Sequence, residues 1–192
     1  MTNSRLIHGF GSNNRKYPTK VDGKPNKEYK QWLSMIRRCY DKKFHTGNPT
    51  YIDCSVSDNF LNYSYFHEWC QWQIGFGVDG IHLDKDILIP NNKIYSEDTC
   101  VFVPSEINLF FTARGNARGE WPIGVYFNKQ EGKFRAQCTV NGKPQHLGYF
   151  STPEEAHAVY KQFKENLCKE LANKWRGKID ERVYNAMMFW SV

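Results

Sequence analysis

One segment in the C-terminal third carries the pattern that most restricts the fold of this chain. From Lys133 to Val140 apolar and polar side chains alternate, and Asn141-Gly142 follows at once. Alternation with a period of two predicts a strand, and Asn-Gly suits the two positive-φ positions of a type I′ hairpin turn. We therefore expect strands at 133–140 and 145–150, with a third strand before them at 123–128.

A long helix is expected directly after these strands. Thr152 and Glu155 have the spacing of a capping box, in which each side chain accepts a hydrogen bond from the backbone N–H of the other residue. The residues that follow place an apolar stripe on one helical face, at Ala156, Tyr160, Phe163, Leu167 and Leu171. The sequence thus predicts a three-stranded antiparallel sheet packed on one helix that runs towards Trp175.

The other face of the middle strand is polar and carries Lys133, Arg135, Gln137 and Thr139. Because successive side chains of a strand point to opposite faces, these donors stand in one row away from the helix. Such a row suits the major groove of DNA, where Arg reads guanine and Gln reads adenine. A solvated face without a partner is the alternative.

Four motifs in this region resemble the AP2/ERF DNA-binding domain in order and spacing: Pro122-Ile123-Gly124-Val125-Tyr126, Lys133-Phe134-Arg135-Ala136, Leu147-Gly148-Tyr149-Phe150 and Thr152-Pro153-Glu154-Glu155-Ala156. The resemblance implies that the sheet enters the major groove of double-stranded DNA and that the helix packs behind it. By position, the contact face comprises Tyr126, Asn128, Arg135, Gln137, Thr139 and His146, with Lys129, Lys133 and Lys143 at phosphates. Arginines and tryptophans of the plant proteins are replaced here, so no base preference carries over.

Charge is unevenly distributed along the chain. Residues 1–45 hold 11 Lys or Arg against 3 Asp or Glu, residues 46–120 hold 4 against 10, and residues 121–175 hold 8 against 5. Two basic regions separated by an acidic one predict two surfaces for a polyanion. The basic linker of residues 112–120 adds Arg114 and Arg118 as DNA-contact candidates.

The acidic middle region contains a second candidate site. His82, Asp84 and Asp86 recur at every second position within an expected strand from Ile81 to Ile89, so all three would share one face. An imidazole beside two carboxylates suits a divalent cation, which can polarise a scissile phosphate. An acidic, solvated hairpin is the alternative, and spacing alone favours it.

This region is also similar to the ββα-metal finger of HNH nucleases, especially the homing-endonuclease-like proteins of phages. The similarity rests on His82-Leu83-Asp84-Lys85-Asp86-Ile87, Asn91-Asn92-Lys93, Tyr95 to Cys100 and Asn108, together with upstream residues from Trp32 to Trp69. It implies one Mg²⁺ or Mn²⁺ per site, held by Asp84, Asp86 and Asn108. Lys85 stands where the family has its general-base His, and Thr99 where it has an orienting Asn. A lysine beside two carboxylates is a poor base, so His82 is the candidate substitute.

The predicted fold class is α+β. A flexible basic arm (1–27) precedes a degenerate HNH-like domain (28–111), the linker (112–120) and an AP2-like domain with a helical extension (121–192). The implied function is metal-dependent hydrolysis of duplex DNA by a phage protein in the bacterial cytoplasm. A DNA-binding regulator that retains the HNH scaffold without activity is the alternative, and a structural interaction protein would leave the charge pattern unexplained.

The remaining composition argues against several other classes. The six cysteines form no C-x-x-C pair, which predicts reduced, mostly buried thiols and no structural zinc. No segment has the roughly 18 consecutive apolar residues of a membrane span, and the polar N-terminus does not resemble a signal peptide.

Overall fold

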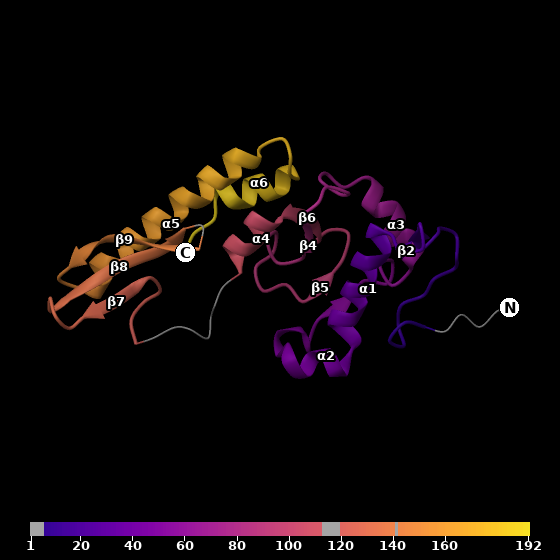
Figure 1. The fold of residues 1–192 in the computed structure, drawn as a ribbon, viewed down its shortest axis with the longest axis horizontal. Helices are drawn as coiled ribbons and strands as arrows, with labels where there is room; N and C mark the ends of the chain where they lie inside the picture. The colour runs from indigo at the N-terminus through magenta and orange to yellow at the C-terminus, as the bar shows by residue number, and fades with distance from the viewer. Residues whose placement is uncertain (1–5, 113–119, 141) are drawn as a thin grey trace. The chain divides into compact units, whose positions relative to one another are not determined.

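A computed structural model describes residues 6–112, 120–140 and 142–192. These residues divide into two compact units. The first contains the described residues up to Asn108 together with Gly177–Val183, and the second contains those from Leu109 to Arg176 together with Tyr184–Val192. The division falls just before the expected linker, whereas the return of residues 177–183 to the first unit was not expected. The described chain is mixed α+β, which confirms the predicted fold class at that level (Figure 1).

Two helices and a dense aromatic cluster form the core of the first unit. Helix α1 (Lys27–Tyr40) packs on α3 (Tyr63–Gln71), and α2 (Lys42–Gly47) and the 3₁₀ turn η1 (Pro49–Tyr51) follow α1. Trp32 is fully buried, and its indole N–H donates to the carbonyl of Phe60 at 2.8 Å. This bond satisfies the one polar group of the side chain, so its full apolar area contributes to stability.

The segment before α1 is held against the first unit. The N–H of Ser12 donates to Leu61 O, and Tyr17 stacks on the ring of His67 at 4.1 Å. A short antiparallel hairpin follows, made of β1 (Lys20–Val21) and β2 (Lys24–Pro25). Contacts of residues 12–18 thus hold part of the expected flexible arm beside α3.

Small strand pairs complete the first unit. Strand β3 (Ser55–Val56) pairs in parallel with β5 (Ile94–Tyr95), and β4 (Ile81–Asp84) pairs antiparallel with β6 (Val101–Pro104). Helix α4 (Ser105–Phe111) begins directly after β6. The order β4, β6, α4 is strand, strand, helix, as in a ββα unit, but β4 ends at Asp84 instead of continuing to Ile89.

The second unit contains the predicted three-stranded sheet. Strands β7 (Val125–Asn128), β8 (Lys133–Val140) and β9 (Lys143–Phe150) form an antiparallel sheet in that order, and α5 (Pro153–Trp175) packs against it (Figure 1). The predicted capping box is present at the start of α5. Helix α6 (Glu181–Met188) is the last element.

Gly124 lets the first strand of the sheet pass close to the helix. Its φ is +81°, and a Cβ atom there would lie 2.1 Å from the ring of Tyr160 on α5. Any side chain would therefore collide with that ring, in a backbone conformation that only glycine adopts at low cost. This glycine fixes the spacing between sheet and helix.

All six cysteines are buried, as the sequence predicted. Burial raises the pKa of the Cys39 thiol to about 12, so this side chain stays protonated and unreactive at neutral pH. None of the helices in the described part of the chain combines the length and apolar character that a bilayer span requires.

Candidate nucleic-acid interface

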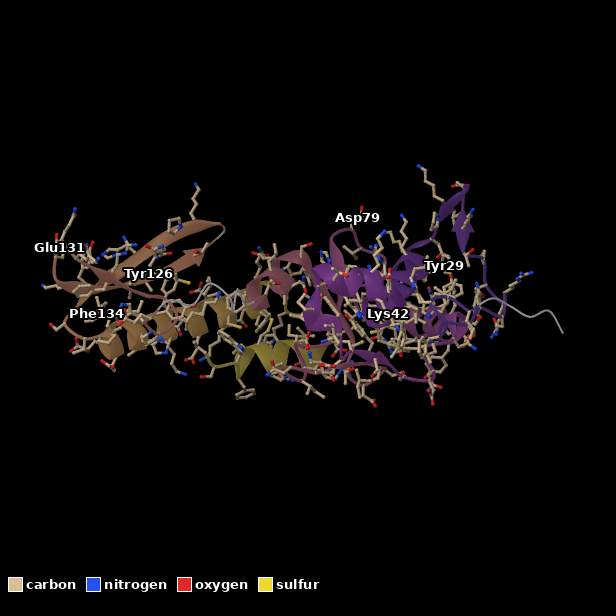
Figure 2. All side chains as sticks on the ribbon, turned by 90° about the horizontal axis from the view of Figure 1, so that it is seen from below. Tyr29, Lys42, Asp79, Tyr126, Glu131 and Phe134 are labelled. Carbon is tan, nitrogen blue, oxygen red and sulfur yellow. The ribbon has the colours of Figure 1, made fainter. Side chains whose placement is uncertain are left out.

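Strand β8 separates an apolar face from a polar one. Ala136 and Cys138 are 0% and 3% exposed on the face that α5 covers. Arg135, Gln137 and Thr139 alternate with them and point to the opposite face. Figure 2 shows the side chains of this sheet, with Tyr126 and Phe134 labelled. Since α5 packs on one face of the sheet, the polar face is the open one among the described residues.

A row of three side chains crosses the open face. Tyr126 on β7 pairs with Arg135 on β8, and Arg135 pairs with Tyr149 on β9. The two tyrosines are 53% and 43% exposed, and the Arg135 guanidinium lies 5.7 Å from the Tyr126 ring centroid. Arg135 forms no salt bridge with any described residue. The Tyr126 ring thus lies beside the guanidinium, whose five N–H donors are not neutralised by a carboxylate of any described residue.

Tyr149 joins this row because of a β-bulge. The register between β8 and β9 shifts between Ala136 and Gln137, so that Ala136 opposes Gly148 and Gln137 opposes His146. The extra residue on β9 puts His146 and Tyr149 on the same face although they are three positions apart. Their rings are 4.7 Å apart, and the Tyr149 hydroxyl accepts a hydrogen bond from Asn128 Nδ2 at 3.2 Å.

Sequence reasoning included His146 but missed Tyr149. Plain alternation from His146 puts Tyr149 on the helix side of the sheet. The available signal was Gly148, since an isolated glycine within a strand often marks a bulge. Gly148 has a φ of +138°, which suits that role.

The other predicted DNA-contact residues surround the row, with one exception. Asn128, Lys133 and Thr139 belong to the open face by register, and Lys129 follows at the end of β7. The exception is Lys143, which pairs with Val140. Val140 belongs to the face that α5 covers, so Lys143 lies on that face, at the exposed end of the hairpin. A hollow of about 260 Å³ is lined by Tyr126, Phe127, Asn128, Lys129 and Arg135. Arg114 and Arg118 lie outside the described residues.

The second candidate site is organised around the end of β4. Asp84 Oδ1 accepts the backbone N–H groups of Asp86 at 2.8 Å and of Ile87 at 2.7 Å. This turn ends the strand, so Asp86 does not continue the face that His82 and Asp84 share, and the expected alignment of three ligands is corrected. Burial raises the pKa of the Asp84 carboxyl, against the lowering effect of the two N–H donors.

Lys85 is held as a buried ammonium group. It is 6% exposed, and its Nζ donates to Asp86 Oδ1 at 2.7 Å, Asp86 Oδ2 at 2.8 Å and the carbonyl of Asn92 at 2.5 Å. Asn92 in turn donates from Nδ2 to the carbonyl of Lys85. Asp86 and Asn92 thus engage all three N–H donors of the Lys85 ammonium, so the group is committed to structural hydrogen bonds.

The remaining residues predicted for this site have separate surroundings. His82 is exposed, with Nε2 2.8 Å from Ser105 Oγ. Thr99 is buried and donates from Oγ1 to the carbonyl of Ile94, which makes it part of a turn. Asn108 lies on α4.

The oxygen donors predicted to bind a metal ion are largely engaged by other groups. Both carboxylate oxygens of Asp86 accept from Lys85, and one oxygen of Asp84 accepts two backbone N–H groups. Across residues 6–112, 120–140 and 142–192, no three His, Cys, Asp or Glu side chains are grouped so that they could hold a metal ion. A cation bound by Asp86 would therefore have to compete with Lys85 for both carboxylate oxygens.

Comparison with family models, with curated proteins and with solved structures finds no match to this chain. The similarities to the AP2/ERF and HNH families therefore remain predictions from sequence motifs.

Proposed function

We propose that this protein binds duplex DNA through the open face of the β7–β8–β9 sheet, with Arg135 as the central contact. The observation that carries this proposal is the row of Tyr126, Arg135 and Tyr149 across three strands, in which the guanidinium has no carboxylate partner. A major groove about 12 Å wide admits a two-stranded ribbon, and β8 with β9 forms such a ribbon. Lys129 and Lys133 supply charge for phosphates at one end of this surface.

The row argues for a binding surface over an ordinary solvated face. Flanking tyrosines restrict the conformations of Arg135 before any ligand arrives, so less side-chain entropy is lost on binding. A solvated arginine would gain nothing from that restriction. The exposed rings of Tyr126 and Tyr149 also offer apolar area for sugars and thymine methyl groups.

Binding is tested with the full chain and a pool of random duplexes, by fluorescence anisotropy at several salt concentrations. Arg135→Gln should weaken binding about tenfold or more, as expected when a contact worth about 1–3 kcal/mol is removed. Arg176→Gln, which removes an exposed arginine at the end of α5, is the matched control and should change little. Binding that is absent, or equal for both variants, would refute the proposal.

Hydrolysis of DNA by the first unit is a second proposal. The order β4, β6, α4 favours it, as do His82 and Asp84 on one face of β4. The engagement of Lys85 by Asp86 and Asn92 weighs against it and leaves His82 as the group able to accept a proton. The binding protein without hydrolysis is therefore the better supported of the two functions.

A nicking assay separates these functions. Supercoiled plasmid is incubated with Mg²⁺ or Mn²⁺ and wild-type protein, Asp84→Ala, or Asp58→Ala as an exposed control. Nicking by wild type and control that is lost in Asp84→Ala would support hydrolysis. Retention of plasmid without nicking by any of the proteins would overturn hydrolysis and leave the binding function standing.

A further inference from the structure

The β1–β2 hairpin, residues 20–25, projects from the first unit and carries two lysines and one aspartate. Asp22 and Gly23 at its tip have φ values of +49° and +74°, the pair of positive angles that a type I′ turn requires. Both strands are exposed, with Val21 at 59%. Figure 2 shows the hairpin as a two-stranded ribbon that extends from the body of this unit.

Asn26 fixes the base of the hairpin to α1. Its N–H donates to Thr19 O at 3.0 Å, its Nδ2 donates to Pro18 O at 2.7 Å, and its Oδ1 accepts the N–H of Tyr29 as the N-cap of α1. The buried Tyr63 also donates to Pro18 O, at 3.1 Å. One residue thus closes the hairpin and starts the helix, so the hairpin has a fixed direction.

The lysines on and beside the hairpin form few ion pairs, although Asp22 at its tip carries one carboxylate. Among the described residues, Lys20, Lys24 and Lys30 have no carboxylate partner, whereas Lys27 pairs with Asp79. The register pairs Lys20 with Pro25 and Lys24 with Val21, so the two hairpin lysines lie on opposite faces of the ribbon. Lys30 lies near the start of α1, where the helix dipole disfavours a positive charge. Its charge therefore does not stabilise the helix.

The size of the hairpin fits one groove of duplex DNA. Sheets packed face to face lie about 10 Å apart, so a ribbon with side chains on both faces is about 10 Å thick; this exceeds the minor-groove width of about 6 Å and fits the major-groove width of about 12 Å. Three residues of each arm, from the base to the tip, span about 10 Å, close to the major-groove depth of about 8.5 Å. In that position each face of the ribbon meets one phosphate-lined wall.

We propose that the β1–β2 hairpin is a second DNA-contact element, which enters the major groove with Lys20 and Lys24 at phosphates on its two walls and Lys30 at the adjoining backbone. This inference rests on the proposed DNA-binding function and adds a site on a different unit. Because phosphates carry no sequence information, this contact strengthens binding to all duplexes alike.

The salt dependence of binding tests the proposal. Lys20→Gln/Lys24→Gln should reduce the steepness of log K against log salt by about 1.8, since each phosphate contact contributes about 0.9. Lys169→Gln/Lys178→Gln removes the same charge from exposed positions elsewhere and should leave the slope nearly unchanged. If wild type binds with a steep slope and the two double variants agree, the hairpin proposal is wrong while the DNA-binding function stands. If wild type binds no DNA, both fail.

Crosslinking gives an independent measurement that does not depend on charge. The six native cysteines are buried, so a single exposed cysteine can carry a short photo-crosslinker. Val21→Cys should crosslink to duplex DNA, whereas Ile52→Cys, at 57% exposure on η1's C-terminal side, should not. Equal crosslinking from both positions, or none from Val21→Cys when wild type is bound, would overturn the proposal.

Discussion

The Lys85–Asp86 ion pair tests how buried charge affects the stability of the first unit, because its two side chains differ in exposure. The Lys85 side chain is 7% exposed and that of Asp86 is 50% exposed. Asp86→Ala leaves a buried ammonium with only the carbonyl of Asn92 as acceptor. Lys85→Met removes the buried charge and leaves a carboxylate that water can reach. We therefore expect the aspartate variant to lose more stability.

The magnitudes follow from these exposures. Removing one partner of a fully buried pair costs about 3–5 kcal/mol, and the half-exposed position of Asp86 reduces this to about 2–4 kcal/mol because water can enter. Replacing the buried lysine by an apolar side chain of similar length costs about 1 kcal/mol, since the carboxylate stays hydrated. The expected difference between the variants is thus about 1–3 kcal/mol.

Urea unfolding followed by circular dichroism measures both losses, with Asp58→Ala as an exposed control expected within about 0.5 kcal/mol of wild type. Equal losses, or a larger loss for Lys85→Met, would refute the account of Lys85 as a buried charge that depends on Asp86. Stabilisation of wild type but not Asp86→Ala by millimolar Mg²⁺ would instead show that Asp86 binds metal in preference to lysine.

Three further outcomes are expected. Gly124→Ala should destabilise the protein by about 2–4 kcal/mol in the same urea unfolding measurement, from the left-handed backbone and the collision with Tyr160. Gly132→Ala, with φ +61° and open space around it, should lose about 1 kcal/mol. Tyr149→Ala should weaken duplex binding about fivefold, or about 1 kcal/mol, without changing the melting temperature; an unchanged affinity would remove Tyr149 from the interface. The raised pKa of Asp84 means that the folded state binds its proton more tightly than the unfolded state, so wild type should lose stability relative to Asp84→Asn as pH rises above the usual value of 3.8. A stability difference that is constant from pH 3 to 7 would contradict this assignment.

The second unit could largely be predicted from sequence because its local signals agree. Alternation from Lys133 to Val140, the Asn-Gly turn and the capping box at Thr152 each specify the same sheet and helix. The bulge between Ala136 and Gln137 could not be placed, because it depends on how two strands pair and not on either strand alone. That single shift decided whether Tyr149 belonged to the open face.

The first unit was harder to predict because hydrogen bonds from side chains to the backbone decide where its strands end. The alternating pattern of His82, Asp84 and Asp86 is the same whether the strand stops or continues. Asp84 ends the strand because its side chain accepts the backbone N–H groups of Asp86 and Ile87. The alternation of residue types does not reveal such hydrogen bonds from a side chain to the backbone. The composition of residues 6–26 likewise suggested a flexible arm, yet Tyr17 and Asn26 anchor it through contacts with α3 and α1.

The two proposed surfaces make different contributions to a single measurable quantity. Phosphate contacts from Lys129 and Lys133 alone would give a slope of log K against log salt of about −1.8, while adding Lys20, Lys24 and Lys30 would give about −4.5. A fourfold rise in salt would then weaken binding by a factor of about 12 in the first case and about 500 in the second. Because base contacts release few counterions, the slope counts phosphate contacts almost independently of sequence preference. The wild-type slope on random duplex thus distinguishes a protein that uses the sheet alone from one that uses the sheet and the hairpin together.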